Sequence, residues 1–174
     1  MLRTAIIALA TAAVGAGCAN TEKTTVTMRL LQKTGGGEKI GTIKAEDTQY
    51  GTLFTPDLSD LPPGLHGFHV HQNATCGAAQ KNGQTVPGLA AGGHYAPNGA
   101  ANHAGPYGSG HLGDLPTLYV DTQGKSNQPV LAPRLKVSDL HGRSLMIHSG
   151  GDNYADEPHK LGGGGSRLAC GVVE

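Results

Sequence analysis

The chain has 174 residues, which is below the size at which a hydrophobic core usually divides into separate domains. Thirteen basic and thirteen acidic residues leave a formal net charge of zero, so nothing in the composition indicates nucleic acid or an anionic surface as a partner. With 28 glycines, 10 prolines and no long segment of helical period, the chain is expected to be all-β with many turns.

Residues 1–19 have the organisation of an export signal. Arg3 precedes a short apolar run, too short to span a bilayer, and the residues that follow this run are all small. The string VGAGC, which ends at Cys18, resembles a bacterial lipoprotein processing site. We favour lipidation of Cys18 over cleavage after Ala19, and both alternatives stay open. In either case residues 20–174 form the mature domain, which is expected in the periplasm with a membrane link only through that lipid.

Alternation of apolar and polar residues predicts strands at five places. Successive side chains of a strand face opposite sides, so an apolar residue at every second position marks a buried face. Two irregular stretches, 72–116 and 149–166, interrupt the pattern, and long loops in a compact domain are usually functional or disordered. The sequence therefore favours a β-sandwich or barrel with two long functional loops. The predicted strands are, in chain order, residues 26–30, 51–55, 65–71, 118–120 and 143–148.

The strand at 65–71 carries the closest pair of histidines. His69 and His71 are two residues apart, so both face one side of the strand, whereas Phe68 and Val70 face the other. Two imidazoles fixed on a strand form a pre-positioned metal clamp. Because imidazole binds copper and zinc alike, the pair predicts a metal site without naming the metal.

A second group of metal-binding side chains lies in the segment 94–114, HYAPNGAANHAGPYGSGHLGD. This segment has too few large apolar side chains to pack by itself, which indicates that a metal orders it. Three histidines and one aspartate make the closed tetrahedral set that structural zinc prefers. We therefore expect a zinc site formed by His94, His103, His111 and Asp114.

His148 ends the alternating run 143–148, in which Leu145 and Ile147 are expected to face the core. Together with the pair on the earlier strand it supplies three imidazoles from two strands. An imidazolate has two ring nitrogens, so His94 can bind zinc through one nitrogen and complete a four-nitrogen copper site through the other. The sequence therefore predicts a copper ion and a zinc ion that share His94.

The cysteine count agrees with export. With Cys18 removed or acylated, Cys76 and Cys170 remain as an even pair in an oxidising compartment. A disulfide between them would join the first long loop to the last strand, and closing so large a loop is worth about 4 to 5 kcal/mol in the chain-entropy model. Two buried free thiols are the alternative, which thiol labelling of the native protein would reveal.

Other polar residues are assigned ordinary roles. His66, His141 and His159 are expected to be surface or hydrogen-bonded core histidines, as most lone histidines are. Lys81 and Lys160 lie in the two long loops. We expect both to be solvated, and steering of an anion toward the site is the alternative.

The strings GLHGFHVH, AGGH, NHAGP, GHLGDLP, LMIHSGGDN and LGGGGSRLACGVV resemble those of copper,zinc superoxide dismutases, specifically of the bacterial periplasmic branch. The resemblance extends from about Thr24 to the C-terminus. It implies an immunoglobulin-like antiparallel Greek-key sandwich or flattened barrel, an architecture for which these enzymes are themselves a standard example. It assigns copper to His69, His71, His94 and His148, and zinc to His94, His103, His111 and Asp114.

The resemblance also implies two further site residues and a reaction. Arg167 matches the family's active-site arginine, whose permanent charge and planar donors would orient superoxide. Asp152 matches the aspartate that accepts hydrogen bonds from one ligand of each metal. The implied activity is disproportionation of superoxide to oxygen and hydrogen peroxide by a redox-cycling copper, with His94 also as proton donor, in defence of the cell envelope. A symmetric homodimer is our default expectation.

Two other functions explain the sequence less well. An exported, non-enzymatic copper- or zinc-binding protein would account for the ligands, but it gives no reason for Arg167 or for two unlike metals that share a histidine. A zinc hydrolase needs a zinc ion with an open position, whereas the predicted zinc set already has four protein ligands. Superoxide consumption by the protein loaded with both metals, compared with the zinc-only form, separates the three.

Overall fold

The computed structural model describes residues 21–174, so the predicted export signal and Cys18 lie outside the described residues. Within that range no helix has the length and apolar character needed to cross a bilayer. Nearly all of the regular structure is β. In chain order the strands are β1 (Lys23–Gln32), β2 (Gly35–Thr48), β3 (Gly51–Leu58), β4 (Gly64–His66), β5 (Phe68–His71), β6 (Ala79–Lys81), β7 (Gln84–Val86), β8 (Leu118–Val120), β9 (Val130–Ala132), β10 (Arg143–His148) and β11 (Arg167–Val173), and the short 3₁₀ helices are η1 (Leu89–Ala91), η2 (Val137–Leu140) and η3 (Lys160–Gly163).

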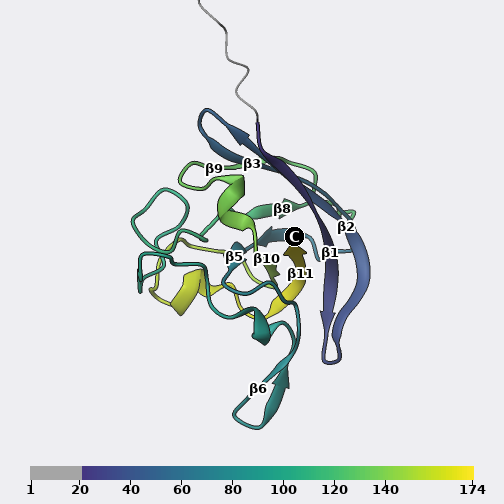
Figure 1. Ribbon diagram of the computed structural model, residues 1–174. Helices are drawn as coiled ribbons and strands as arrows, with labels where there is room; N and C mark the ends of the chain where they lie inside the picture. The colour runs from purple at the N-terminus through teal and green to yellow at the C-terminus, as the bar shows by residue number, and fades with distance from the viewer. Residues whose placement is uncertain (1–20) are drawn as a thin grey trace, which may run out of the picture.

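Seven strands form one curled antiparallel sheet in the order β5-β10-β11-β1-β2-β3-β9 (Figure 1). β4 and β5 are separated only by Gly67, and β4 pairs with β8. In space, β8 therefore lies beside β4, the chain continues from β4 into β5, and the seven-stranded sheet runs from β5 to β9. Along the chain, residues 121–129 connect β8 to β9. Because β3 pairs with β9 instead of with the next strand along the chain, the connections are of the Greek-key type. This is the flattened antiparallel barrel that was predicted.

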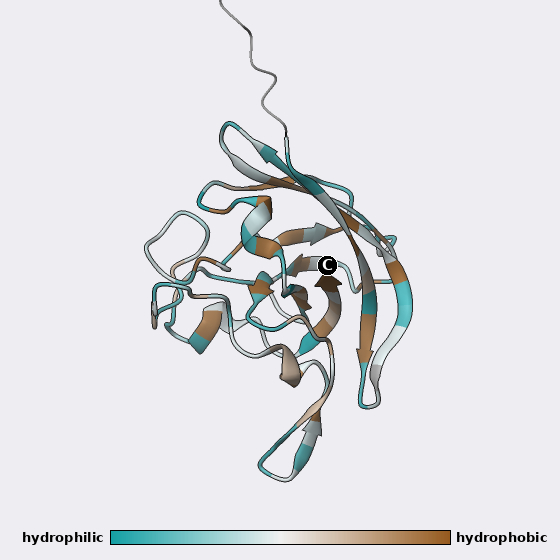
Figure 2. Cartoon of the chain, viewed as in Figure 1, coloured by the Kyte–Doolittle hydropathy of each residue, from teal (hydrophilic) through white to brown (hydrophobic). Residues whose placement is uncertain are grey.

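The barrel encloses one main apolar core. Alternate residues of each strand point inward, as in β1, where Val26 and Met28 are buried and Thr27 between them is exposed. Figure 2 shows the resulting alternation of brown and teal along the strands. Phe54 and Phe68 are fully buried and meet edge to face, with ring centroids 5.4 Å apart. Such an aromatic pair adds about 0.5 to 1.5 kcal/mol beyond the burial of its area.

The five predicted strands are all present, with one difference. β1, β3 and β8 contain the predicted runs, and β10 has the predicted bounds. The run 65–71 is instead divided into β4 and β5 at Gly67, whose amide donates to the carbonyl of Gly150 in the second long loop. Phe68 and Val70 still lie in the core, as the alternation predicted.

The first long loop contains a hairpin that was not predicted from the sequence. β6 and β7 pair around a turn at Asn82 and Gly83, both of which have a positive φ. An Asn-Gly pair is a strong hairpin signal. The two strands have only three residues each and no alternating apolar residues, so the alternation pattern did not reveal them. The hairpin extends away from the barrel (Figure 1) and carries Lys81 at the end of β6.

Candidate metal centre

Three backbone segments are joined where the predicted ligands gather. The amide of Val70 donates to the carbonyl of Gly113. The amide of Tyr95 donates to the carbonyl of Val70, and the amide of Gly113 donates to the carbonyl of Tyr95. All three hydrogen bonds are 2.8 to 2.9 Å long. Each of these residues is a chain neighbour of a predicted ligand. A side chain at position 113 would clash with the backbone of Val70 and Tyr95, so a glycine is required there. The buried strand β5 therefore sets the positions of both loop segments.

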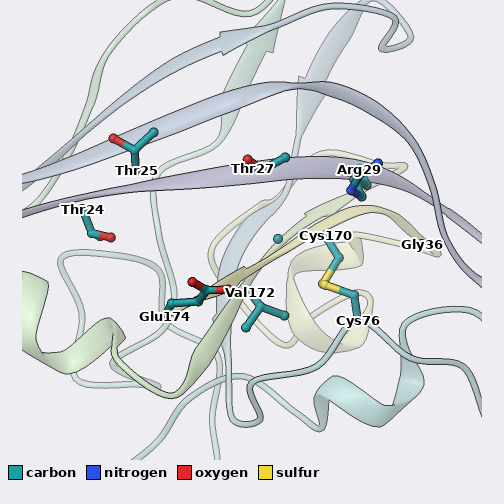
Figure 3. Close-up of a pocket in the computed structure, with 10 residues that line it drawn as sticks. Thr24, Thr25, Thr27, Arg29, Gly36, Cys76, Cys170, Val172 and Glu174 are labelled. Carbon is teal, nitrogen blue, oxygen red and sulfur yellow. A yellow bond between two sulfur atoms is a disulfide. The ribbon is translucent and has the colours of Figure 1, made fainter.

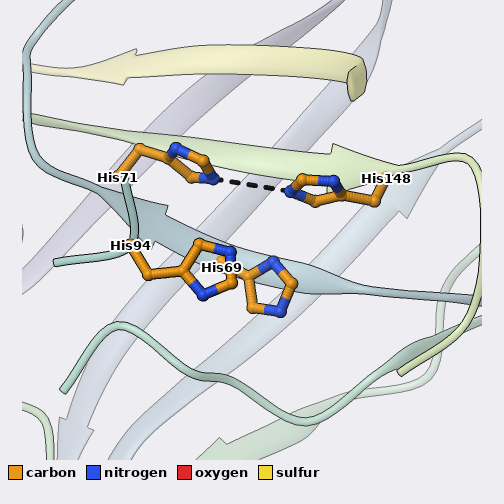
Figure 4. Close-up of side chains that lie close together, drawn as sticks. All are labelled: His69, His71, His94 and His148. Atoms are coloured by element: carbon orange, nitrogen blue, oxygen red, sulfur yellow. Dashed lines mark hydrogen bonds between the residues drawn. The ribbon is translucent and has the colours of Figure 1, made fainter. Parts of the chain in front are cut away.

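Four imidazoles form the first cluster, which consists of His69, His71, His94 and His148 (Figure 4). All four residues are buried. One ring nitrogen of each lies within 4.8 Å of the others. Nitrogens bound to one ion at about 2.0 to 2.1 Å can be at most about 4.2 Å apart, so this spacing needs only a small closure. The first cluster is the predicted copper set.

The outer hydrogen bonds of two of these rings decide which nitrogen carries the proton. Nδ1 of His71 donates to the carbonyl of Gly92 at 2.9 Å, and Nδ1 of His148 lies 3.4 Å from the carbonyl of Gly165, which can only accept. The Nε2 atoms of these two rings face each other at 3.4 Å. In the neutral rings both of these atoms present lone pairs. Two facing lone pairs do not form a hydrogen bond, but they are well placed for a shared cation.

The second cluster surrounds one carboxylate oxygen. Oδ1 of Asp114 lies 2.9 Å from Nδ1 of His94, 2.9 Å from Nδ1 of His103 and 3.2 Å from Nδ1 of His111. All four residues are buried. Three nitrogens and one oxygen within 4.8 Å of one another make a donor set typical of tetrahedral zinc. The second cluster is the predicted zinc set, and His94 belongs to both.

Unpaired nitrogens show that these clusters fit metal ions. Among residues 21–174, Nδ1 of His69, Nε2 of His94 and Nδ1 of His103 are buried and have no hydrogen-bond partner. The His103 atom lies 2.9 Å from the Asp114 carboxylate, but the two are not aligned as a hydrogen bond. A buried polar atom without a hydrogen-bond partner lowers the stability of the fold by about 1 to 3 kcal/mol, and native proteins rarely contain such atoms. Three such atoms together are explained by one ion in each cluster.

Asp152 connects the two clusters. Its Oδ2 accepts a 2.8 Å hydrogen bond from Nε2 of His69, and its Oδ1 accepts one of 2.8 Å from Nε2 of His103. These two hydrogen bonds agree with the role that the family resemblance implied for Asp152. They leave Nδ1 of each ring free to face a cluster. The three side chains also lie close enough together to hold an ion. Because the carboxylate already accepts from both rings, we assign no third metal.

Burial keeps the first cluster neutral. Together with the charge of neighbouring imidazoles, it holds the pKa of His71 and that of His148 well below the usual range. Burial also lowers the pKa of His94 to about 4, although the contact with Asp114 opposes the shift. Neutral imidazoles have the free lone pairs that metal binding requires.

His103 differs from the other histidines of the site. Burial alone would lower its pKa, but its contacts with Asp114 and Asp152 outweigh burial and raise the pKa to about 9. The two carboxylates remain ionised in spite of burial, because the same contacts hold their pKa values well below the usual range. Two buried carboxylates beside one imidazole create a negative field that favours a divalent cation.

Arg167 lies at the start of β11, close to the first cluster. Its guanidinium donates to the carbonyl of Gly88 at 2.5 Å and to that of Gly92 at 2.6 Å. The Gly92 carbonyl also accepts from His71, so it connects the arginine with a ring of the first cluster. Burial lowers the pKa of Arg167, but a guanidinium keeps its charge near neutral pH. A positive charge is thus held in a fixed place beside the four imidazoles.

A disulfide joins Cys76 to Cys170, which confirms the predicted pairing and excludes two free thiols (Figure 3). Cys170 lies three residues after Arg167 on β11. Cys76 lies in the first long loop, as do Gly88 and Gly92, whose carbonyls accept from Arg167. The disulfide and the two guanidinium hydrogen bonds therefore join the same two segments.

Some contributions to the site were not recognised in the sequence. His66 is a buried, hydrogen-bonded histidine, as expected, but its Nδ1 lies 2.7 Å from the carbonyl of His148 and its Nε2 lies 2.7 Å from that of Pro62. It therefore helps to hold the backbone of a first-cluster residue. The carbonyls of Gly88 and Gly92 gave no signal, because every residue type has a carbonyl.

The other singled-out residues are exposed, as expected. His159 and Lys160 lie on the second long loop and Lys81 on the β6–β7 hairpin. His141 is also exposed, and its Nε2 lies 3.0 Å from the carboxylate of Glu22. None of these four residues belongs to the two clusters.

Comparisons with known proteins agree with this geometry. The family model described as copper/zinc superoxide dismutase matches residues 39–173. A superoxide dismutase [Cu-Zn] of Pasteurella multocida is 53% identical over 151 residues, which cover 86% of this chain and 81% of that protein. The solved structure of the Cu/Zn superoxide dismutase from Brucella abortus is 49% identical, with a TM-score of 0.87 over 88% of this chain and 100% of that one. The monomeric copper, zinc superoxide dismutase from Salmonella enterica, solved in solution, is 50% identical, with a TM-score of 0.79 and the same coverage.

Proposed function

Because the chain belongs to the copper/zinc superoxide dismutase family, oxidoreductases that bind one copper and one zinc ion, we propose that its two clusters hold these ions and share His94. The overall reaction converts two superoxide anions and two protons into one oxygen and one hydrogen peroxide. Copper supplies the one-electron oxidation and reduction, and redox-inert zinc orders the loop. The proposed copper ligands are His69, His71, His94 and His148, and the proposed zinc ligands are His94, His103, His111 and Asp114.

The position of His94 carries this proposal. Its Nδ1 lies 2.9 Å from Asp114 in the second cluster, whereas its buried Nε2 has no hydrogen-bond partner among residues 21–174. A ring with one nitrogen in each donor set is suited to bind both ions. Electron paramagnetic resonance of the copper-loaded protein tests this, since adding zinc is expected to change a nitrogen-rich copper signal. A copper signal that is indifferent to zinc would contradict the shared ring.

Activity requires a second measurement. Superoxide consumption is expected from the protein loaded with both metals and not from the zinc-only form. A doubly loaded protein that leaves superoxide unchanged would favour an exported metal-binding protein without enzymatic activity.

We propose that Arg167 attracts and orients superoxide. The two carbonyls that accept from its guanidinium fix the orientation of the fork, and the remaining N–H groups are left to donate to a small anion. Five donors are available and the carbonyls engage two nitrogens, so an anion can be bound without breaking either contact. The fixed charge would also favour superoxide over the neutral products.

We further propose that Nε2 of His94, whenever it is not bound to copper, holds a proton and delivers it for the formation of hydrogen peroxide. This atom is buried and lacks a hydrogen-bond partner among residues 21–174, so within this range no protein group competes for a proton placed there. A correctly folded, copper-loaded His94→Ala protein is expected to lose turnover. Unchanged turnover in that protein would contradict both this role and the shared ring.

The place of action is proposed from the leader sequence. An export signal with a lipoprotein-type site at Cys18 would direct the mature domain to the periplasm, where it would protect the envelope from superoxide of extracytoplasmic origin. Mass spectrometry of the mature N-terminus tests this. A mature chain that begins at a lipid-modified Cys18 is expected, and an unmodified chain that begins at Asn20 would exclude the lipid anchor while leaving export in place.

A homodimer remains the proposed assembly. Two-fold symmetric pairs are the commonest soluble oligomers, although the Salmonella enterica relative described above is monomeric. Sedimentation velocity of the metal-loaded protein is expected to show a species of twice the chain mass. A single species at the chain mass would overturn the dimer.

A further inference from the structure

The segment between the proposed zinc ligands His103 and His111 has little means of ordering itself. Residues 104–110 include three glycines and a proline, and this described stretch contains neither strand nor helix. Its one large side chain, Tyr107, is 73% exposed. Each residue that is fixed loses about 1 to 2 kcal/mol of backbone conformational entropy. Contacts from outside the segment must therefore hold the two histidines at the spacing that zinc needs.

Arg134 provides such contacts. Its Nε donates to the carbonyl of Pro106 at 3.0 Å, and one terminal nitrogen donates to that of Gly110 at 3.2 Å. The other terminal nitrogen donates to Gly105 at 3.3 Å and to His111 at 2.6 Å. The shortest of the four bonds is thus made to the backbone of a proposed zinc ligand. The four bonds to four carbonyls use four of the five donors of a planar guanidinium, and the three donors of a lysine cannot reproduce them.

The arginine is itself anchored to the barrel. It follows β9, and its neighbours Ala132 and Leu135 are buried in the main core. The hydroxyl of Thr52 on β3 donates to the carbonyl of Leu135 in a buried hydrogen bond of 2.8 Å. The guanidinium therefore reaches the zinc loop from a rigid part of the fold.

The zinc loop also closes at its base. The amide of His111 donates to the carbonyl of Asn102 at 3.2 Å. A side chain at position 110 would clash with that same carbonyl, so the two ends of the loop approach closely through Gly110. With its ends joined and four of its carbonyls bonded to one guanidinium, the segment 102–111 is a compact surface loop organised by a side chain from outside it.

On the basis of the zinc site proposed above, we propose that Arg134 is a positioning residue that orders the segment 102–111 before zinc binds. His103 and His111 then present their nitrogens near the spacing of the site, and zinc completes the order of a loop that Arg134 already holds. Direct electrostatics cannot explain such an effect, because a guanidinium repels a zinc ion. Lysine at position 134 keeps the repulsive charge but loses the planar fork, so it separates geometry from charge.

Competition with a chromophoric zinc chelator on the full mature chain tests the proposal. The Arg134→Lys and Arg134→Met proteins are expected to bind zinc about 10- to 100-fold more weakly, the range found when a residue that orients a metal ligand is lost. Their copper affinity, measured in the same way, is expected to change little, because all four proposed copper ligands lie outside the segment 102–111. Lys136→Met, which removes an exposed charge two residues away, should change neither affinity.

Two results of the chelator competition with these variants would overturn this role of Arg134. One is a wild-type zinc affinity in Arg134→Lys, and the other is an equal loss of zinc and copper affinity, which would indicate general destabilisation. Hydrogen exchange in the metal-free wild type gives a further measurement that needs no variant. The His111 amide is expected to be protected there, and rapid exchange would contradict an ordered loop. A wild-type chain that binds no zinc would overturn the zinc site together with the role of Arg134, whereas zinc binding that is insensitive to position 134 overturns the role alone.

Discussion

The carboxylate of Asp152 accepts a hydrogen bond from one ring of each cluster, so its two oxygens orient one proposed ligand of each metal. In Asp152→Asn the amide keeps one acceptor and turns its NH₂ group toward the N–H of the other ring. That ring loses its orientation, and the affinity for its metal is expected to fall by about 10- to 100-fold. Chelator competition for copper and zinc measures the loss. Asp57→Asn, the same change at an exposed position of β3, is the control and should alter neither affinity.

Gly162 illustrates how closely the second long loop packs against this carboxylate. The residue has a φ of +71°, and a Cβ there would overlap the Asp152 side chain. Gly142 has the same φ of +71° but no atom within 4 Å of its Cβ position, so Gly142→Ala measures the backbone strain alone. That strain is expected to cost about 1 to 2 kcal/mol in urea unfolding. Gly162→Ala should cost more and should also lower the bound metal measured by mass spectrometry. Full metal content in the folded Gly162→Ala protein would contradict this packing argument.

At the scale of strands and loops, alternation predicted only part of the barrel, because it did not mark β2, β9 or β11. The alternation along β10 gave its bounds, and the alternation along β5 placed Phe68 and Val70 in the core. These rules succeed because one buried face is enough to fix a strand. The same rule missed the division at Gly67, which depends on a hydrogen bond to Gly150, 83 residues further along the chain.

The ligands were predicted from residue type, but the contacts that support them were not. An HxH pair and a histidine-rich loop indicate a metal because few other roles require such a pattern. Arg134 carries no comparable signal, because its partners are carbonyls that lie 23 to 29 residues away in sequence. The β6–β7 hairpin could have been found from its Asn-Gly turn, since that dipeptide favours the positive φ values observed there.

The disulfide acts on two elements together, the first long loop and β11. Its cysteines are separated by 94 residues, so replacing both with serine is expected to lower the free energy of unfolding by about 2 to 5 kcal/mol, measured in urea. Because Gly88 and Gly92 lie on the tethered loop, Arg167 should also become less well fixed, and kcat/KM should fall in the folded double variant. A stability loss with unchanged kcat/KM would show that the two guanidinium hydrogen bonds suffice to hold the arginine.

At the scale of the whole molecule, a formal net charge of zero means that attraction of superoxide depends on where the charges lie. Arg167 is fixed beside the first cluster. Lys160 is exposed at the start of η3, four residues before Gly164. Gly164 packs against the first cluster, because a Cβ added to it would lie 3.3 Å from the His148 ring. Lys81 lies on the hairpin that extends away from the barrel (Figure 1). Of the two lysines, Lys160 is therefore the better placed to add to the field of the arginine.

This distribution predicts how the rate depends on salt. The attraction between exposed charges and an approaching anion is screened over about 10 Å at 0.1 M ionic strength, so kcat/KM of the wild type is expected to fall as salt is added. Arg167→Ala should lower kcat/KM by about tenfold or more at low salt, because electrostatic focusing is worth that much, and should flatten the dependence on salt. Lys160→Ala should reduce the slope by a smaller amount, and Lys81→Ala, the matched control, should leave it unchanged. A wild-type rate that is flat in salt would contradict steering altogether, and an equal effect of the two lysines would assign the steering to net charge instead of to placement.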